Sequence, residues 1–279
     1  MTTPMLTIAS APGSWRPAPV ELRGSVDPDQ VAALADLLGV DAPGLGDPIR
    51  PLWHEVLLRD PVRWSELGVD GHPRSSALLP PIADRRRMFG GSVVRAHGPL
   101  RVGEDVRRTV RATDVRHRPG RSGDLLLVTE AHAWTVEGEL LLEEQRSIIY
   151  RSAAAPVEPS PMPDTTPGRR DAILDERALF LFSALTRNTH RIHYDAAYAR
   201  TVEGHRGLLV QGPLTALLAA EAVHRKTRRA VTTFDYRLVG PCHVGEPLSF
   251  AVTPSDDNRV RVTGRAAERE CLTAIAELK

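Results

Sequence analysis

One short stretch in the second half of the chain, LFSALTRNTHRIHYD at residues 181–195, combines an amide and two imidazole side chains directly after an apolar run. A histidine has an unperturbed pKa of about 6.5, so His193 can both accept and donate a proton near neutral pH. Asn188 has a neutral amide that exchanges no proton, but this amide can position a water molecule by hydrogen bonds. We therefore predict a catalytic pocket that contains His193 as general acid or base and Asn188 as a positioning residue. The alternative is that this cluster is the polar end of a helix.

A second candidate site lies at the start of an apolar segment, in the sequence Gln211-Gly212-Pro213. Proline suits the first turn of a helix, where its missing N–H would have no partner, and glycine permits close approach of the backbone. We therefore expect the Gly212 N–H group and the positive end of the helix to stabilise an oxyanion. Gln211 and His190 are expected to line the same pocket as substrate-binding residues.

Few helices are expected. The segment GPLTALLAAEAVHR from Gly212 carries Ala or Leu on nearly every face, which is typical of a buried helix. Two shorter helices are predicted over 27–38 and 175–186, and each begins with an aspartate that can cap its first turn. The first half has no comparable Ala/Leu helix before its strands, because prolines and glycines interrupt the segment PLWHEVLLRDPVRWSELGVDGHP at 51–73.

Alternating apolar and polar residues, separated by turn residues such as Glu137-Gly138, predict four antiparallel strands in each half. The expected strands cover residues 91–97, 105–116, 124–136 and 139–150 in the first half, and 231–239, 247–254, 258–266 and 270–278 in the second. Each half also contains a Gly-Pro-x-x-Val-Gly-Glu segment, GPLRVGE from Gly98 and GPCHVGE from Gly240. This repeat indicates an internal duplication.

A linker divides the chain. Residues 152–170, SAAAPVEPSPMPDTTPGRR, are rich in Pro, Ala and Ser and have no apolar periodicity. The predicted domains are therefore 1–151 and 171–279.

The composition excludes several classes of protein. A net charge of +1 lacks the basic excess of a nucleic-acid-binding protein. No stretch approaches the roughly 20 apolar residues that span a bilayer, and the first residues lack the pattern of a secretory signal peptide. Only Cys242 and Cys271 are present, and we expect both to be reduced. We predict a cytoplasmic protein that binds neither nucleic acid nor membrane.

Several segments resemble those of MaoC-like enoyl-thioester hydratases and dehydratases. They are FSALTRNTHRIHYDAAYA from Phe182, GLLVQGPL from Gly207 and, in the first half, LWHEVLL, ELGVDGHP, RRMFGG and GRSGDLLLVT. Within this family, the chain is most similar to the mesaconyl-C4-CoA (3-methylfumaryl-CoA) and itaconyl-CoA hydratase type and to the mitochondrial 3-hydroxyacyl-thioester dehydratases. The resemblance covers nearly the whole chain.

The resemblance implies an α+β fold called a double hotdog, in which two antiparallel sheets each curve around a helix. It also implies that the first-half central helix is short or missing, which leaves room for the acyl chain. The implied activity is that of a hydro-lyase without a metal or redox cofactor. Coenzyme A or phosphopantetheine would be part of its acyl-CoA or acyl-carrier-protein substrate. A homodimer is expected.

The family's Asp-x-Asn-Pro-x-His-x-Asp motif carries over only in part. Its histidine falls on His193 and its trailing aspartate on Asp195, which we expect to brace the loop, but its leading aspartate falls on Asn188. Gln211 also stands where Val-His-Gly is more usual. These departures keep three alternatives open: thioester hydrolysis, a polyketide or natural-product dehydratase or cyclase on the same fold, and an acyl-thioester-binding protein without catalysis.

Two further groups of residues have simpler explanations. The basic residues after the apolar helix could meet CoA phosphates, but a solvated helix end is the preferred interpretation; they are Arg225, Lys226, Arg228 and Arg229. The histidines of the first half lack the spacing of metal ligands and are predicted to be structural. They are His54, His72, His97, His117 and His132.

Overall fold

A computed structural model describes residues 6–8, 10–11, 13–61, 63–74, 76–80, 82, 85–120, 123–152 and 174–279. Nearly all of the predicted linker lies outside the described residues, apart from Ser152, which ends a strand. The proposed domain boundaries therefore stay predictions.

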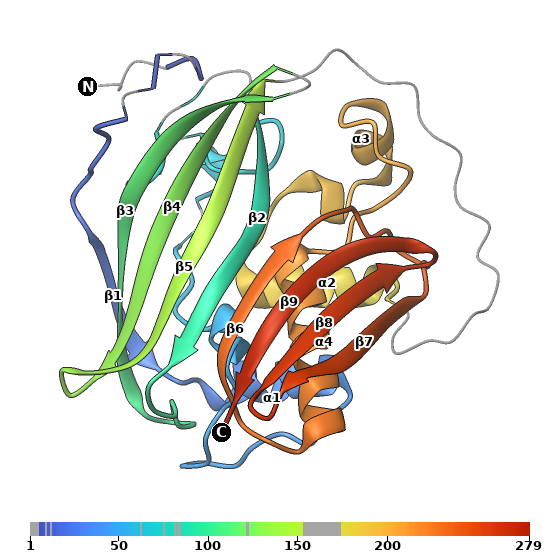
Figure 1. Cartoon of the computed structure of the whole chain (residues 1–279). Helices are drawn as coiled ribbons and strands as arrows, with labels where there is room; N and C mark the ends of the chain where they lie inside the picture. Colours follow the sequence, from blue (N-terminus) through green and yellow to red (C-terminus); the bar gives the residue numbers. More distant parts are fainter. Residues whose placement is uncertain are drawn as a thin grey trace.

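The structure is built on one antiparallel sheet with the order β1-β3-β4-β5-β2-β6-β9-β8-β7 (Figure 1). Its strands are β1 (Val20–Ser25), β2 (Arg85–Ala96), β3 (Asp105–Gly120), β4 (Gly123–Val136), β5 (Glu139–Ser152), β6 (Val231–Leu238), β7 (Leu248–Asp256), β8 (Arg259–Ala266) and β9 (Arg269–Leu278). All eight predicted strands are confirmed, whereas β1 was not predicted and β2 begins earlier than expected. The sheets of the two halves join edge to edge through β2 and β6, so they form a single layer.

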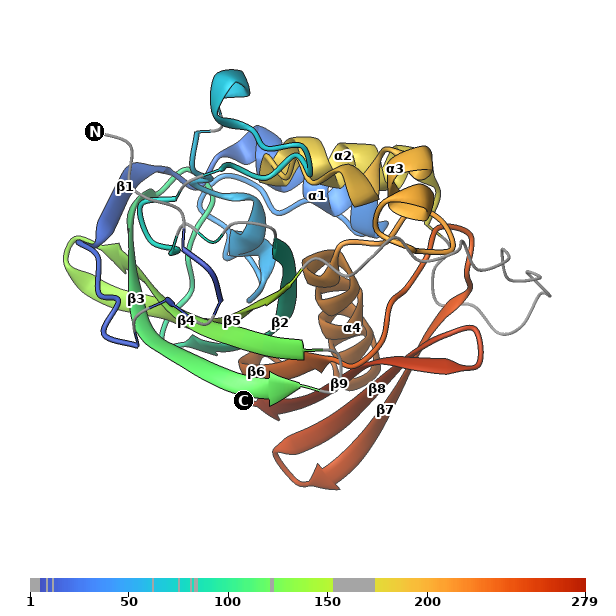
Figure 2. The ribbon, with the colours of Figure 1, turned by 90° about the horizontal axis from the view of Figure 1, so that it is seen from above.

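The helices lie on one side of this sheet (Figure 2). As predicted, α1 (Pro28–Leu38) and α2 (Glu176–Thr186) begin after Asp27 and Asp175, whose side chains accept hydrogen bonds from the first turn. The apolar helix is α4 (Gly212–Thr227), in which residues 214–223 are all buried. The helical segments that were not predicted are short: α3 (Ala196–Thr201), η1 (Trp53–Val56), η2 (Trp64–Glu66) and η3 (Arg191–His193).

The two Gly-Pro-x-x-Val-Gly-Glu segments form the same turn. In the first half, Arg101 N donates to Glu104 Oε2 at 3.1 Å, and in the second half His243 N donates to Glu246 Oε2 at 2.9 Å. In both turns a glutamate at the end of the segment thus binds the backbone three residues earlier. This shared geometry supports the internal duplication inferred from the sequence.

The bridges formed by these two turns identify the segment of the first half that corresponds to α4. Arg101 forms an isolated β-bridge with Pro48, and His243 forms the corresponding bridge with Leu209. Shortly after Leu209 the chain enters α4, whereas shortly after Pro48 it enters only the single turn of η1. The predicted loss of the first-half central helix is therefore confirmed.

Charged side chains occupy the concave face of the first-half sheet instead of a helix. Arg146 donates through Nε to Glu144 at 2.8 Å and pairs with Glu55 on η1. Glu144 also accepts from Ser92 Oγ at 2.7 Å and lies 3.1 Å from His54 Nε2. All five side chains are buried. Because an unpaired buried charge costs several kcal/mol, each of these charges depends on its partners.

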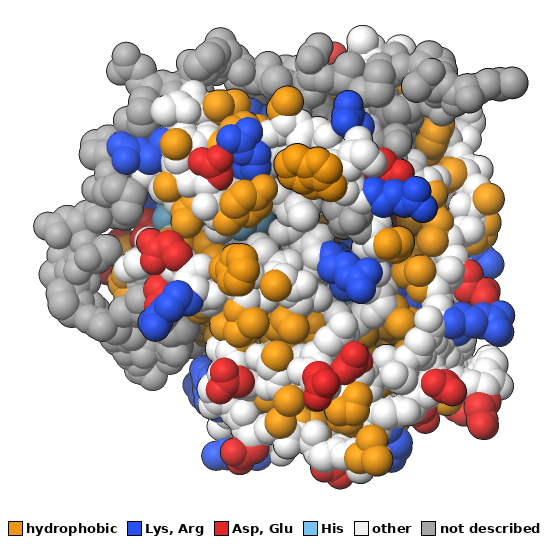
Figure 3. Space-filling view, turned by 180° about the vertical axis from the view of Figure 1, so that it is seen from behind, with side chains coloured by type: hydrophobic (Ala, Val, Ile, Leu, Met, Phe, Trp, Pro, Cys, Tyr) orange, Lys and Arg blue, Asp and Glu red, His pale blue; other side chains and the backbone are white. Residues whose placement is uncertain are grey.

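The surface and the cysteines agree with the composition. Acidic, basic and hydrophobic side chains are interspersed on the face seen in Figure 3. Cys242 and Cys271 are buried free thiols. Among the described residues, none of the helices combines the length and hydrophobicity needed to cross a membrane.

The network around Arg146 leads to a prediction on stability. Arg146→Met leaves Glu55 and Glu144 buried without their cation, so we expect the free energy of unfolding to fall by about 3–5 kcal/mol. Urea denaturation measures this change. The control is Arg23→Met, whose ion pair with Glu21 is exposed and whose loss should cost less than about 1 kcal/mol. Equal losses in the two variants would contradict a structural role for the network.

Candidate functional site

The hydratase-like motif begins where α2 ends. Arg187 adopts a left-handed conformation with φ of 49°, and Asn188 N then donates to Ser183 O at 2.9 Å. Asn188 Oδ1 accepts a hydrogen bond from His190 N at 3.2 Å, so its carbonyl oxygen stabilises the turn. The Nδ2 group and the second lone pair of Oδ1 are left to contact water or substrate. Asn188 thus has a role in the helix-terminal turn, and its predicted positioning role stays a prediction.

His193 is buried at the end of η3. Its Nδ1 atom lies 2.8 Å from Leu209 O, and because a carbonyl oxygen can only accept, Nδ1 must carry the proton. Nε2 is therefore the unprotonated nitrogen. Burial, together with the charges of the nearby His190 and His205, lowers the pKa of His193 to about 3. The hydrogen bond to Leu209 O acts in the opposite direction. At neutral pH, His193 is thus a neutral imidazole with an unprotonated, weakly basic Nε2 atom.

His190 lies between His193 and a histidine of the first half. Its ring stacks on His72 with centroids 4.0 Å apart and meets the ring of His193 edge-on at 5.6 Å. His72 Nδ1 is 3.2 Å from Asp70 Oδ2. On the other side, His190 Nε2 lies 3.9 Å from Glu203. The prediction that His190 lines a pocket is consistent with its burial. His72, for which the sequence predicts a structural role, lies against the motif.

Burial and this pairing also set the protonation states of the first-half residues. Burial and the charge of Arg87 lower the pKa of His72 well below its ordinary value. Burial raises the pKa of Asp70, but hydrogen bonds from His72 outweigh it and hold this pKa at about 2. Asp70 is therefore ionised and His72 neutral at pH 7.

The segment around Gly71 is docked onto the motif by backbone contacts. Arg191 N donates to Asp70 O at 2.9 Å, and Thr189 Oγ1 donates to Gly71 O at 2.5 Å. Gly71 has a φ of 86°, and a Cβ atom built on it would overlap Thr189 O. The only sequence signal for this contact is the family-like segment ELGVDGHP, because the two partners lie more than 100 residues apart.

Asp195 has the bracing role that the sequence predicts. It caps α3 by accepting from Tyr198 N at 2.9 Å, and it pairs with Arg191 at 2.7 Å. These contacts hold η3 and α3 together around His193.

Gln211 is buried at the N-cap position of α4, where its side chain makes no capping hydrogen bond. Its Nε2 group donates to Leu179 O at 3.0 Å and to Ser183 Oγ at 2.9 Å, which joins α4 to α2. Because Leu179 O can only accept, the orientation of the amide is determined, and Oε1 is the remaining atom. Among the described residues Oε1 has no hydrogen-bond partner. An acceptor repels an oxyanion, so Gln211 can contact only a donor such as water.

Gly212 occupies the first position of α4, as predicted. The N–H groups of a first helical turn have no acceptor within the helix, so the Gly212 N–H is directed outward at the positive end of the helix dipole. A Cβ atom built at Gly212 would overlap Leu238 and lie 3.4 Å from Phe89. Glycine thus lets Leu238 and Phe89 pack against the start of α4, and its N–H stays a candidate oxyanion donor.

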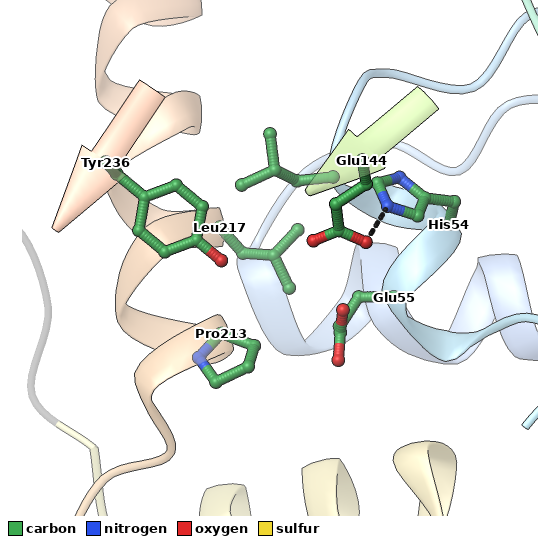
Figure 4. Close-up of a pocket in the computed structure, with 7 residues that line it drawn as sticks. His54, Glu55, Glu144, Pro213, Leu217 and Tyr236 are labelled. Carbon is green, nitrogen blue, oxygen red and sulfur yellow. Dashed lines mark hydrogen bonds and ion pairs between the residues drawn. The ribbon is translucent and has the colours of Figure 1, made fainter. Parts of the chain in front are cut away.

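A small polar cavity lies beside the same turn of α4 (Figure 4). It is lined by Leu52, His54, Glu55, Glu144, Pro213, Leu217 and Tyr236. Burial raises the pKa of Tyr236 well above 10, and Glu144 and Glu55 add to this, so its hydroxyl stays protonated. Burial opposes the ionisation of Glu144, but Arg146 and His54 hold its pKa well below the ordinary value. The cavity therefore presents the ionised carboxylate of Glu144 and a phenol where the first half lacks a helix.

Two groups of donor atoms are close enough to surround a cation. They are Asp70, His72 and His190, and His54, Glu55 and Glu144, with the ligand atoms of each group within 4.8 Å of one another. Folding assembles both groups from separate segments, so sequence spacing did not indicate them. Asp70 already contacts His72, and Glu144 already contacts Arg146. The absence of a metal cofactor stays a prediction.

The basic side chains after α4 contact protein groups. Lys226 Nζ donates to Val252 O at 2.6 Å, and Arg229 donates to Asp257 O and Asn258 Oδ1, also at 2.6 Å. These bonds attach the end of α4 to the hairpin of β7 and β8. They favour a structural helix end over a phosphate site.

Comparison with known proteins agrees with this geometry. The profile of the family described as "Hydroxyacyl-thioester dehydratase type 2" matches residues 52–244, which is more than half of the chain. The chain belongs to this dehydratase family. The family contains hydratases and dehydratases, so the hydro-lyase class that the sequence predicts is confirmed.

Two curated relatives of this dehydratase family are similar in sequence. Mesaconyl-C(4)-CoA hydratase of Chloroflexus aurantiacus is 40% identical over 221 residues, which cover 77% of this chain and 79% of that protein. The mitochondrial hydroxyacyl-thioester dehydratase type 2 of Schizosaccharomyces pombe is 26% identical over 120 residues, 41% of this chain and 40% of that one.

Solved structures confirm the fold. HtdX of Mycobacterium tuberculosis has a TM-score of 0.66 at 18% identity and covers 94% of this chain and 100% of its own. A second M. tuberculosis protein, described as having a double hotdog fold, has a TM-score of 0.59 at 16% identity and covers 99% of both chains. The predicted α+β double hotdog is thus confirmed.

Docking of the first half on the motif leads to a second prediction. Gly71→Ala places a Cβ atom against Thr189 O in a left-handed conformation, so we expect a loss of about 2 kcal/mol or more in stability and a clear loss of activity. Thermal unfolding and turnover are the two measurements. Gly138→Ala is the control, since Gly138 also has a positive φ but no atom within 4 Å of a built Cβ. Comparable losses in the two variants would mean that the contact with Thr189 is unimportant.

The neutral histidines lead to a prediction on pH dependence. In the folded protein the pKa of His193 is about 3, and burial lowers those of His132 and His205 to about 4, whereas an unfolded histidine titrates near about 6.5. Between these values the unfolded chain binds more protons, so the free energy of unfolding falls as the pH falls from 6.5 towards 4. One fully buried histidine contributes up to about 1.4 kcal/mol per pH unit.

Urea denaturation at a series of pH values measures this slope. We expect His193→Gln to reduce the slope, whereas His97→Gln, at a half-exposed histidine, should leave it unchanged. An unchanged slope in His193→Gln would show that His193 is not held neutral by the fold.

Proposed function

We propose that this chain catalyses the reversible hydration of 2-enoyl thioesters, which in the opposite direction is the dehydration of 3-hydroxyacyl thioesters. The observation that carries this proposal is the buried His193, whose Nδ1 proton is held by Leu209 O and whose Nε2 atom is unprotonated at neutral pH. Leu209 lies three residues before Gly212, where α4 begins. The acyl group would be carried by CoA or by the phosphopantetheine of a carrier protein, and no other cofactor is required.

One histidine suffices for both proton transfers. In hydration, His193 Nε2 takes a proton from water as the water oxygen bonds to Cβ, and the π electrons of the double bond move towards the thioester oxygen. The Gly212 N–H then stabilises the enolate, and donors of this kind are typically worth on the order of 3 kcal/mol of barrier. The protonated imidazole finally donates its proton to Cα and returns to its starting state.

Two amides support this step without exchanging protons. Gln211 Oε1 is a buried acceptor and can hold the second hydrogen of the attacking water, while Asn188 Nδ2 can donate to its oxygen. The motif thus works without the leading aspartate of the commoner pattern. Thioester hydrolysis is disfavoured for the same reason, because it needs a carboxylate at this position to direct water.

A short, branched or polar acyl chain is the proposed substrate. The curated relative that is 40% identical is a mesaconyl-C(4)-CoA hydratase, which supports a substrate of this kind. A dehydratase or cyclase of natural-product biosynthesis would use the same site and is the second candidate. The cytoplasmic location and the homodimer, which gel filtration tests, are parts of this proposal.

The absorbance of the enoyl-thioester band tests the proposed function. We expect the band of crotonyl-CoA or mesaconyl-C4-CoA to decay with the wild-type protein, and kcat to fall by about 10²- to 10⁴-fold in His193→Gln, because the group that transfers protons is lost. His97→Gln is the matched control and should retain full activity.

Two outcomes contradict this proposal. Full activity in His193→Gln would place the chemistry elsewhere. Acyl-CoA binding without any turnover by the wild-type protein would indicate an acyl-thioester-binding protein.

A further inference from the structure

Three described arginines point to the concave face of the first-half sheet: Arg87, Arg108 and Arg146. Directly opposed residues of antiparallel strands lie on the same face, and Arg87 pairs with the buried Tyr150 just as Ser92 pairs with Arg146. Phe89 follows two positions after Arg87 on the same face, and its ring lies close to Gly212. Arg87 therefore extends from β2 on the side of the sheet that faces the start of α4.

Arg87 differs from the other two arginines in its partners. Arg146 is paired with Glu55 and Glu144, and Arg108 donates to Leu58 O at 2.8 Å and to His132. Within the part of the chain that the structure describes, Arg87 has neither an ion pair nor a hydrogen bond, although it is half-buried. Partial burial of a guanidinium without a counter-ion is costly, and the cost is removed when an anion binds.

The surroundings of Arg87 belong to the candidate site. Its charge acts on His72, which stacks on His190, and the ring of His190 in turn meets that of His193. The nearby carboxylates have other direct partners, since Asp70 binds His72, Glu203 pairs with Arg86 and Glu130 lies 3.3 Å from His132. The charges of Glu130 and Arg87 interact, but within the described residues Arg87 forms no direct ion pair.

We propose that Arg87 binds a carboxylate carried by the acyl group, so that this enzyme prefers enoyl thioesters that bear a second carboxyl group. This inference rests on the proposed function and names its substrate class. A guanidinium binds a carboxylate through two parallel N–H···O bonds, which gives both affinity and orientation. Arg87 is thereby a specificity-determining residue.

The same cation could instead meet a phosphate of CoA, so the experiment must separate the two anions. Mesaconyl-C4-CoA carries the acyl carboxylate, crotonyl-CoA lacks it, and the pantetheine thioester of crotonate lacks both the carboxylate and the nucleotide phosphates. A carboxylate site affects only the first substrate. A phosphate site affects both CoA thioesters and spares the pantetheine thioester.

Arg87→Met removes the charge and keeps most of the length of the side chain. We expect kcat/KM for mesaconyl-C4-CoA to fall on the order of 10- to 100-fold, mainly through KM, because a hydrogen-bonded charge pair is lost. For crotonyl-CoA we expect a change below about 3-fold. For mesaconyl-C4-CoA, the kcat/KM of Arg87→Lys should lie between those of the wild-type protein and Arg87→Met, because lysine keeps the charge without the bidentate geometry.

Arg95→Met is the matched control, since Arg95 is on the same strand but more exposed and pairs with Glu143. It should change neither substrate preference nor stability. Equal losses for both CoA substrates, or no loss for mesaconyl-C4-CoA, in Arg87→Met would overturn the inference.

Binding measurements keep this test independent of turnover. Succinyl-CoA and butyryl-CoA are saturated thioesters with and without a terminal carboxylate, and neither can be hydrated. By calorimetry the wild-type protein should bind succinyl-CoA more tightly, and Arg87→Met should abolish that difference. If the wild-type protein hydrates no substrate but shows this difference, the proposed function fails and the carboxylate site stands; if the difference is absent, the carboxylate site fails.

Discussion

The first half of this protein is organised by the need to pair a buried arginine. Arg146 lies on the concave face of the sheet at a place where the second half has an apolar helix, and it is neutralised by Glu144 on the same strand and by Glu55 on η1. Buried charges are tolerated only with such partners. The requirement therefore holds η1 against the sheet and leaves a small polar cavity next to it.

The two halves have diverged from one architecture into different roles. Both keep the Gly-Pro-x-x-Val-Gly-Glu turn and its bridge to a passing segment, at Pro48 in one and Leu209 in the other. After the bridge, the chain of the second half continues into α4, whose first turn carries the candidate oxyanion donor. At the corresponding place, the first half has only η1 and its buried polar side chains. The site lies between the halves because neither contains all of its parts.

Burial controls the chemistry of the site as well as its shape. His193 and His72 are kept neutral because the protonated forms would lose solvation, and one backbone carbonyl determines the tautomer of His193. A weakly basic imidazole that accepts a proton returns it readily, which suits a reaction in which the same group must do both. Beside these neutral histidines, the charge of Arg87, which has no ion pair within the described residues, is the feature that we propose distinguishes one acyl group from another.

The sequence by itself determined the features that depend on neighbouring residues. The eight predicted strands, the caps of α1 and α2, the buried α4, the bracing role of Asp195 and the family follow from periodicity, short-range hydrogen bonding and local motifs. These are set within a few residues along the chain, so a single sequence suffices to read them.

Only the tertiary structure decided the composition of the site. In the folded chain His72 contacts His190, and the amide nitrogen of Gln211 donates a hydrogen bond to Leu179 O on α2. The carbonyl oxygen of Asn188 accepts a hydrogen bond within a turn, and Arg87 has no ion pair among the described residues. Each outcome depends on which groups from distant segments arrive within hydrogen-bond distance and on how much water they exclude. Residue type and spacing carry no information on either quantity, because both arise only when the two halves pack together.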